Sequence, residues 1–376
     1  MRVRSVVGTL VAVGVLAALA FLAVPAVLHS DAATTTSVVA GAAPQQLPAG
    51  PLPAAVRTRW SAPGAAEVGS GTVVVADSSG VAGRDPLTGA QRWSYHRGNA
   101  RLCDWTSRDG VVVAVFGKRH GCTEMTALDA GTGVRRWYRT AELGAEVDLT
   151  SAPGTVVARS GDQLIAVDTA SGLNRWTARK PGCRYQPVAV GGLGAVAVLD
   201  CGARTLLVSH DPYLDKQRWS RPVPGTRPVV LAVTDQRVAV LSGDRGGTLS
   251  VYDGSGHRLA LVTDPRMASP AAGGQPPGLS VGGLLLYWTG RSVVALDPAA
   301  GAVRWAAPAS GPPVPDADRV LCAVPGGFAE LSPKTGRQVR RIAAGEDGAG
   351  PPRGALLARV GRLVVAAGDA ETTVSG

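Results

Sequence analysis

Short β-rich runs, each followed by a polar turn, recur along most of the chain. Runs of valine, alanine and leucine such as 110–116 and 193–199 have the composition of buried strands. A recurring phrase joins one such strand, a turn of Asp, Thr or Ser and Gly, and a strand ending in Trp, most clearly at 127–137, 166–176 and 295–305. Because Asp bonds to nearby backbone N–H groups and Gly accepts a positive φ, each phrase predicts a β-hairpin.

The spacing of these phrases indicates a repeat architecture. Weaker copies run from 85 to 93, from 211 to 219, from 253 to about 261 and from 332 to 340. The turns begin at positions 85, 129, 168, 211, 253, 297 and 332, with steps of 44, 39, 43, 42, 44 and 35 residues. A second strand pair precedes each hairpin, so one repeat of about 40 residues predicts four strands, the content of a propeller blade.

The repeated positions are predicted to be structural. An indole at the same place in each outermost strand is a large flat surface that suits the contact between successive blades. The residues given this role are Asp85, Trp93, Asp129, Gly133, Trp137, Asp168, Gly172, Trp176, Asp211, Trp219, Asp297, Gly301, Trp305 and Trp60.

The two ends of the chain predict an eighth blade. The segment 354–367 supplies another strand pair and 371–374 a third strand, but no Trp-bearing strand follows. The segment 54–63 resembles 302–308 without its turn, and it can supply the missing outer strand. The expected fold is therefore an all-β, eight-bladed β-propeller over residues 54–376, closed by both termini so that no raw sheet edge remains.

The repeat Ala-x-Asp-x-x-Thr-Gly-x-x-x-Trp resembles that of the pyrroloquinoline-quinone (PQQ)-like propellers. This superfamily includes quinoprotein alcohol dehydrogenases and the BamB-like assembly lipoproteins, and the composition is similar to that of GC-rich actinobacterial, membrane-anchored members. The dehydrogenase branch implies adjacent cysteines over the quinone and a calcium site with Glu, Asn and Asp. This chain has no adjacent cysteines and only two asparagines, Asn99 and Asn174.

The sequence therefore predicts no cofactor, metal or catalytic residue. Gly278-Leu-Ser280-Val-Gly282 matches the nucleophile-elbow pattern, but a strand follows it where that chemistry needs a helix. We expect a non-catalytic binding or scaffold module for a protein, polymer or ligand. The alternative is a PQQ-dependent oxidoreductase.

The N-terminus predicts the compartment. Arg2 and Arg4 precede an uncharged run in which residues 6–28 make 23 residues, roughly 34 Å as a helix against a hydrocarbon core of about 30 Å. We expect a signal-anchor over 1–28, with a cleaved signal peptide as the alternative, and a flexible Ala/Thr/Pro-rich stalk over 29–53. The positive-inside rule then predicts a single-pass protein of the cell membrane with its propeller on the extracytoplasmic side.

The cysteines agree with export. Cys103 and Cys122 are 19 residues apart and Cys183 and Cys201 are 18 apart, at nearly the same place in two repeats. Neighbouring strands lie within disulfide reach, which predicts the bridges Cys103–Cys122 and Cys183–Cys201 rather than a zinc site. Cys322 is left over and is expected to be a buried thiol.

The net charge of +10 comes from 34 arginines and four lysines against 28 acidic residues. Arginine directly precedes the repeat Trp at positions 59, 92, 136, 175, 218 and 304. Two roles remain open, protection of the outer strands against edge-to-edge pairing and a basic belt for an anionic partner. Nucleic acid is not expected, because no aromatic stacking module accompanies the arginines. The partner and the oligomeric state stay open, and the connections 263–278 and 306–316 are the expected contact loops.

Overall fold

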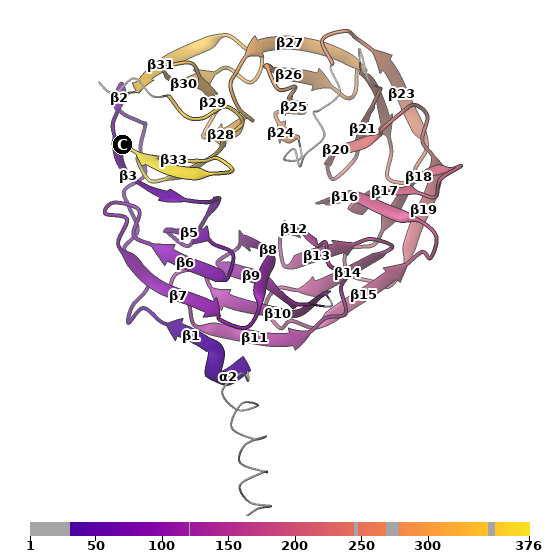
Figure 1. The fold of residues 1–376 in the computed structure, drawn as a ribbon. Coiled ribbons are helices and arrows are strands. Elements are labelled where there is room, and N and C mark those ends of the chain that lie inside the picture. The colour runs from indigo at the N-terminus through magenta and orange to yellow at the C-terminus, as the bar shows by residue number, and fades with distance from the viewer. Residues whose placement is uncertain (1–30, 120, 244–246, 268–277, 345–349) are drawn as a thin grey trace, which may run out of the picture.

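The chain forms a closed ring of eight antiparallel sheets around a central axis (Figure 1). The computed structural model describes residues 31–376 except 120, 244–246, 268–277 and 345–349. Each blade has four strands that follow one another in the chain, except that the last blade takes its outer strand from the N-terminal part. In two of the sheets a fifth strand from the N-terminal part is added at the outer edge. The predicted eight-bladed propeller is thus confirmed.

The strands of the first four blades follow in chain order. Blade 1 contains β4 (Ala66–Gly69), β5 (Thr72–Ala76), β6 (Gly80–Arg84) and β7 (Gln91–Arg97). Blade 2 contains β8 (Arg101–Arg108), β9 (Val111–Lys118), β10 (Gly121–Asp129) and β11 (Arg135–Thr140). Blade 3 contains β12 (Asp148–Ala152), β13 (Thr155–Ser160), β14 (Gln163–Asp168) and β15 (Asn174–Arg179). Blade 4 contains β16 (Arg184–Gly191), β17 (Gly194–Asp200), β18 (Thr205–His210) and β19 (Gln217–Pro222).

The other four blades complete the ring. Blade 5 contains β20 (Val229–Val233), β21 (Val238–Ser242), β22 (Thr248–Tyr252) and β23 (Arg258–Thr263). Blade 6 contains β24 (Leu279–Val281), β25 (Leu284–Trp288), β26 (Ser292–Asp297) and β27 (Ala302–Pro308). Blade 7 contains β28 (Val314–Asp316), β29 (Arg319–Val324), β30 (Gly327–Leu331) and β31 (Gln338–Ala344). Blade 8 contains β32 (Leu356–Val360), β33 (Leu363–Ala367), β34 (Glu371–Ser375) and β3 (Thr58–Pro63).

The hydrophobic core lies between the blades. Middle strands such as β9 are buried along seven successive residues, because a neighbouring blade packs on each of their faces. One apolar cluster, for example, joins Val113 and Val115 of blade 2 to Val156 and Val167 of blade 3. Outer strands such as β11 alternate between exposed and partly buried residues, because one of their faces meets solvent.

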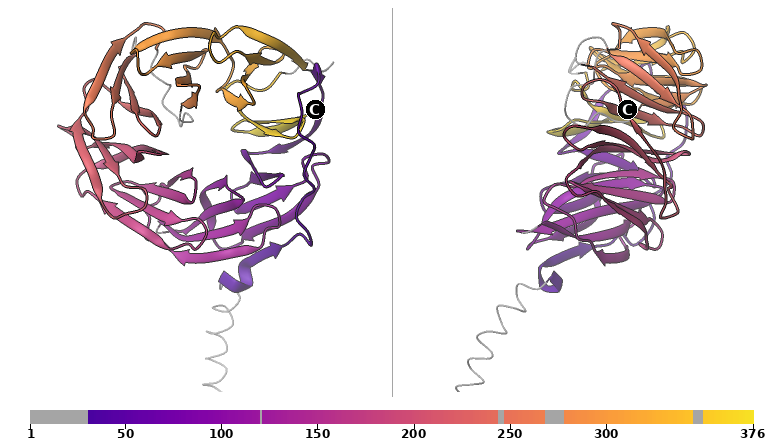
Figure 2. Two further views of the ribbon diagram at one scale, coloured as in Figure 1. Left: turned by 180° about the vertical axis from the view of Figure 1, so that it is seen from behind. Right: turned by 90° about the vertical axis from the view of Figure 1, so that its right-hand side faces the viewer.

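The ring closes in blade 8 as the sequence predicts. Strand β3 pairs antiparallel with β34, with Trp60 opposite Val374 and Pro63 opposite Glu371. Both termini of the propeller therefore share one sheet, and the left view of Figure 2 shows the C-terminus beside the N-terminal part of the chain. This pairing removes the free edge that β34 would otherwise expose.

The segment ahead of β3 runs along the outside of the ring. It contains the short helix α2 (Asp31–Thr34), strand β1 (Thr35–Val38) and strand β2 (Ala55–Val56). Strand β1 pairs antiparallel with β7 of blade 1, and β2 pairs parallel with β31 of blade 7 (Figure 1). Between them the side chain of Leu52 is only 2% exposed. Residues 35–56 therefore bind to the ring over much of the range for which the sequence predicted a flexible stalk.

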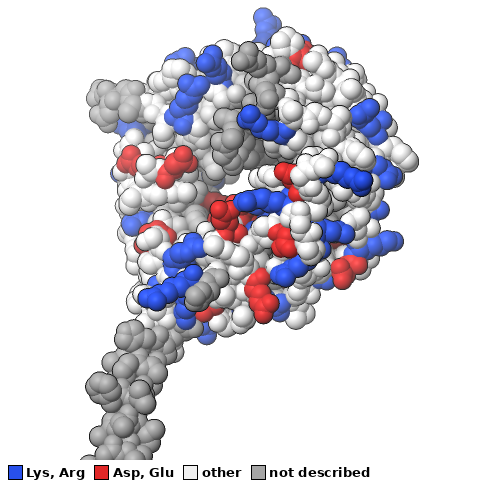
Figure 3. Space-filling view, turned by 45° about the vertical axis from the view of Figure 1, so that its right-hand side comes forward, with Lys and Arg blue, Asp and Glu red and all other residues white. Residues whose placement is uncertain are grey.

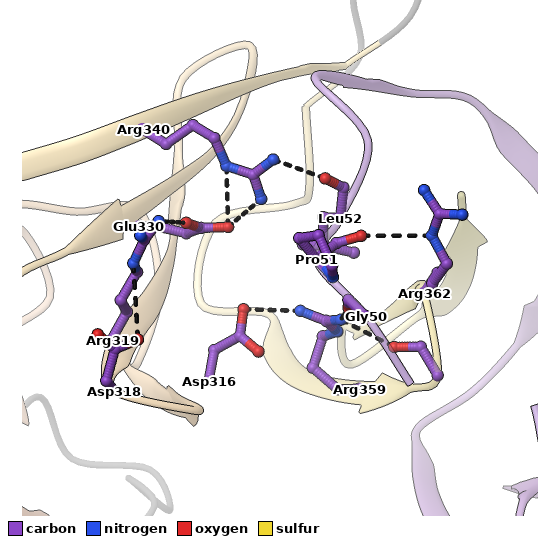
Figure 4. A network of polar contacts seen from close by, with 11 residues as sticks. Gly50, Pro51, Leu52, Asp316, Asp318, Arg319, Glu330, Arg340, Arg359 and Arg362 are labelled. Carbon is purple, nitrogen blue, oxygen red and sulfur yellow. Dashed lines mark hydrogen bonds and ion pairs between the residues drawn. The ribbon is translucent and has the colours of Figure 1, made fainter. Parts of the chain in front are cut away.

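Arginines of blades 7 and 8 hold this segment (Figure 4). Arg340 donates to the carbonyl oxygen of Leu52 over 2.6 Å and pairs with Glu330. Arg359 donates to the carbonyl oxygen of Gly50 over 2.8 Å and to Asp316 over 2.6 Å. Because these guanidinium groups satisfy backbone carbonyls that no strand partner reaches, the segment is fixed without regular pairing.

The predicted signal-anchor, residues 1–28, lies outside the described residues. Among those described, no helix has the length and apolar character needed to cross a membrane.

Candidate functional site

The repeat turns show why the sequence keeps Asp at their first position. One carboxylate oxygen of Asp129 accepts the backbone N–H groups of Gly131 and Thr132, at 3.1 and 3.0 Å. Asp85, Asp168, Asp211 and Asp297 make the same pair of bonds. These aspartates are therefore used to close hairpins, and none of them reaches the centre of the ring.

The repeat tryptophans bind each blade to the next. Five of them donate from Nε1 to the carbonyl of the second turn residue in the following blade over 2.8–3.0 Å; they are Trp60, Trp93, Trp137, Trp219 and Trp305. The turn glycine of that blade lies against the indole: a Cβ on Gly133 would come within 2.7 Å of Trp93, and one on Gly172 within 2.6 Å of Trp137. The glycine is thus required both for its positive φ and for this close approach.

Trp176 is an exception at the junction of blades 3 and 4. The turn that it faces, 211–216, contains no glycine, and the buried Nε1 of Trp176 has no partner among the described residues. Instead the indole stacks on His210, with ring centroids 5.1 Å apart. Burial lowers the pKa of His210 to about 4, so this histidine is neutral at pH 7.

The arginines before the tryptophans pair across their own hairpins. Arg136, Arg175, Arg218 and Arg304 each bind the Asp seven residues earlier over 2.5–2.8 Å. The bond from Arg175 is the largest cause that lowers the pKa of Asp168 to about 2. The charge of these four arginines is therefore largely matched by carboxylates, which reduces the positive field of a basic belt.

Strand β23 of blade 5 lacks both repeat side chains. Its turn is one residue shorter, so Ala260 lies opposite Val251, the place that Trp137 takes opposite Ala127 in blade 2. The sequence predicted the end of this repeat at about residue 261. Because the turn is one residue shorter, the Trp position is instead occupied by Ala260. Leu259 and Leu261 consequently face outward and are 51% and 53% exposed.

The other outer strands are covered or charged. Strands β7 and β31 are partly covered by β1 and β2, and β11, β15, β19, β27 and β3 carry arginine directly before tryptophan. Strand β23 is the last strand of its sheet and carries two exposed leucines instead. An uncovered apolar outer strand is a common site of protein association.

Both predicted disulfides are present, and Cys322 is a buried free thiol as expected. Burial raises the pKa of Cys322 to about 12, so it is unreactive at neutral pH. Cys183 and Cys201 flank paired strands with Cα atoms 4.1 Å apart. Cys103 and Cys122, however, belong to β8 and β10, which β9 separates. The bridge crosses β9 at Gly117, where a Cβ would lie 2.7 Å from the sulfur of Cys103.

A cavity of about 400 Å³ borders the centre of the ring. It is lined by the innermost strands of blades 8, 1 and 2, by Val365 of β33, and by residues 286–288 and 312–314 of blades 6 and 7. Most of its lining is apolar, and the residues with polar side-chain groups include Glu67, Ser107, Arg108 and Tyr287. Figure 3 shows one side of the propeller, which is hollowed near its centre and has acidic and basic side chains around the hollow.

Glu67 on β4 is the carboxylate of this cavity. Its Oε2 accepts hydrogen bonds from the backbone N–H of Ser107 and from Thr106 Oγ1, the latter at 3.3 Å. Burial raises the pKa of Glu67 to about 7, despite these two bonds and the positive charge of Arg108. The neighbouring carboxyl of Asp104, which accepts the N–H of Leu149 over 2.6 Å, also has a raised pKa because of burial.

Sequence reasoning did not identify Glu67, because the residues that meet at the centre are far apart in the chain. Of the expected contact loops, 306–316 supplies Pro312 and Pro313 to the cavity, and most of 263–278 lies outside the described residues. Within the described part of the chain, no three His, Cys, Asp or Glu residues come together as a metal site requires.

Comparison with known proteins supports the same fold. The family model described as outer membrane protein assembly factor BamB matches residues 103–228 and 289–375, more than half of the chain. No curated protein matches the sequence.

Three solved structures share the propeller at low identity. BamB from Moraxella catarrhalis is 16% identical with a TM-score of 0.55 over 85% of this chain and 97% of that one. The computationally designed protein Ika8 is 14% identical with a TM-score of 0.59, over 85% and 98%. Sqt1 of Saccharomyces cerevisiae is 15% identical with a TM-score of 0.53, over 81% and 92%. Together with the family match, the eight closed blades and their repeat place this chain in the BamB-like family of PQQ-like β-propellers.

Proposed function

We propose that this protein is a membrane-anchored, extracytoplasmic scaffold that binds another protein through the outer strand of blade 5 and catalyses no reaction. The observation that carries the proposal is the exposure of Leu259 and Leu261 on β23, where other blades present arginine or an added strand. A family match to an assembly factor supports a role in protein association.

The chemistry of β23 favours a polypeptide partner. Its two leucines lie two residues apart, so both project from the same side of the strand, and their burial would stabilise a complex by removing apolar surface from water. Arg258 at the start of the strand is exposed and makes no ion pair with a described residue. A partner that presents apolar residues beside a carboxylate would match both features.

The anchor and the compartment are part of the proposal. The uncharged run 6–28 is long enough to span a bilayer, and two disulfides are typical of a protein exposed to oxidising surroundings. We expect the full-length chain to stay with membranes after alkaline carbonate extraction. Protease added outside wall-stripped cells should remove the propeller, and release of a mature chain beginning near Ala32 would favour a cleaved signal instead.

The binding surface can be tested by crosslinking from matched positions. A photo-crosslinking residue at Leu261 should give a discrete adduct with a membrane or wall-space protein, whereas the same residue at Ala306, the equivalent place on β27, should not. The protein that crosslinks from position 261 should no longer co-purify with the double variant Leu259→Lys and Leu261→Glu. The melting temperature of the variant should equal that of the wild type. Equal adducts from 261 and 306, or co-purification that survives the double substitution, would reject β23 as the binding surface.

A further inference from the structure

The lining of the central cavity has two chemically different parts. One is an apolar wall that includes Trp288, Pro312, Pro313 and Leu356, and the Leu356 side chain remains 45% exposed. Glu67, Ser107 and Arg108 form a polar part of the same lining. A volume of about 400 Å³ lies within the usual range of small-molecule sites, and a mainly apolar lining with a few polar groups is their usual composition.

The carboxylate of Glu67 has one oxygen available to a ligand. Oε2 is held by the N–H of Ser107 and by Thr106 Oγ1, and Thr106 Oγ1 in turn lies 3.2 Å from Ser151 Oγ on β12. No described residue donates a hydrogen bond to Oε1. The side chain is therefore oriented by its neighbours, while its other oxygen has no donor among the described residues and Glu67 lines the cavity.

We propose that this cavity binds a small organic cation in which a primary ammonium group is attached to an apolar body, with the ammonium on Glu67 Oε1 and the body against Leu356 and Trp288. A buried carboxylate attracts a cation more strongly than one in water, because little solvent screens the pair. This attraction must exceed the repulsion between the ammonium and the nearby charge of Arg108. The apolar wall contributes by covering surface that Leu356 now exposes to solvent. This site is separate from β23 and does not depend on the protein-binding role.

Binding of such a cation must compete with a proton on Glu67. The charged groups that face Glu67 are Asp104 and Arg108 of β8, while Arg359 of β32 is engaged by Asp316 and Gly50, and β5 and β33 bring no charge. Since burial raises the pKa of Glu67 to about 7, the carboxylate is largely ionised at pH 8 and largely protonated at pH 6. The affinity for an ammonium ligand should therefore fall about tenfold between pH 8 and pH 6.

The test uses three probes of one shape and different charge. Full-length protein in detergent is titrated calorimetrically with 3-phenylpropylammonium, neutral 3-phenylpropanol and 3-phenylpropionate. We expect saturable binding of the ammonium, at least tenfold weaker binding of the alcohol and none of the carboxylate. Glu67→Gln should weaken ammonium binding at least tenfold and remove its pH dependence, while Glu371→Gln, at an exposed site of blade 8, should leave both unchanged.

Two further results keep the outcome decisive. Leu356→Asn should weaken the ammonium and the alcohol to a similar degree, because it removes the apolar contact and leaves the carboxylate. The comparison between pH 8 and pH 6 needs no variant, so it tests the site even if Glu67→Gln fails to fold. Absence of saturable ammonium binding at millimolar concentration, or equal affinity for the ammonium and the alcohol, would overturn the proposal.

Discussion

Blades 2 and 5 share the four-stranded plan but differ in how they are joined to the rest of the ring. In blade 2, Trp137 packs on the turn of blade 3, Arg136 pairs with Asp129, and a disulfide ties β8 to β10. In blade 5, Ala260 takes the place of the tryptophan, and Leu259 and Leu261 are exposed. The strands of blade 5 form nonetheless, so Trp and Arg are not required for a blade to fold.

What blade 5 retains explains how it holds its place. Leu241 and Leu249 of its middle strands pack with Leu285 and Leu296 of blade 6 in one buried cluster. Apolar sheet faces are therefore sufficient to join two blades, and the repeat Trp adds a second contact near the rim. Where that contact is missing, as in β23, the outer strand presents exposed apolar side chains to solvent.

The largest difference should appear when the rim contact itself is removed. Trp93 is fully buried against the turn of blade 2 and donates to Ala130, so Trp93→Ala should lower the free energy of unfolding by about 3–5 kcal/mol. Leu261→Ala, on the bare strand of blade 5, should change it by no more than about 0.5 kcal/mol. Urea unfolding followed by circular dichroism measures both, and a Leu261→Ala cost near that of Trp93→Ala would show that β23 is packed rather than free.

The second difference is the covalent one. Replacing Cys103 and Cys122 together by serine opens a loop closed over a sequence separation of 19 residues, which should cost about 3 kcal/mol in the chain-entropy model. Blade 5 has no bridge, and Cys322→Ala in blade 7 removes a buried thiol that forms no bridge. Thermal unfolding under oxidising conditions gives the melting temperatures of the wild type, the double variant and the Cys322 variant. If the double variant melted at the wild-type temperature, the bridge would not contribute to the stability of blade 2.

The sequence was sufficient to predict the ring because its signal is local and repeated. Asp, Gly and Trp recur at fixed offsets, and each offset reflects a contact within a hairpin or with the next turn, as Asp129, Gly133 and Trp93 show. The closing strand β3 was predictable for the same reason, because 54–63 matches the end of a repeat. Both disulfides followed from their equivalent places in two repeats, although the first crosses β9 and does not join adjacent strands.

The cavity could not be predicted from the same signal. Glu67 meets Ser107 because successive blades bring their first strands side by side, and nothing in the spacing of about 40 residues marks which side chains will line the centre. The attachment of residues 35–56 was missed because proline and small residues there show no periodicity. The arginines that hold them, Arg340 and Arg359, are 288 and 309 residues away from their partners Leu52 and Gly50. Such contacts depend on the closed ring.

A smaller difference should separate two turn glycines. A Cβ at Gly133 would lie 2.7 Å from the indole of Trp93, whereas one at Gly301 would meet only Val262 and Ala260 of blade 5, at 3.1 and 3.3 Å. Both positions have positive φ, so the backbone strain of alanine is common to the two variants. Gly133→Ala should therefore cost about 1–3 kcal/mol more than Gly301→Ala in urea unfolding, from overpacking. Equal costs would mean that the indole of Trp93 moves aside without lowering the free energy of unfolding.

The smallest effect concerns the hydrogen bond that the repeat tryptophan makes. Trp137→Phe removes the Nε1 donor and leaves the carbonyl of Thr169 without it, whereas Trp176→Phe removes a buried donor that has no partner among the described residues. At pH 7 His210, whose pKa burial lowers to about 4, stays neutral and keeps its stacking contact with either ring. Trp137→Phe should therefore cost about 1 kcal/mol more than Trp176→Phe in urea unfolding, because only the first loses a made bond. An equal or larger cost for Trp176→Phe would show that this Nε1 is bonded in solution and that the junction of blades 3 and 4 is as well satisfied as its neighbours.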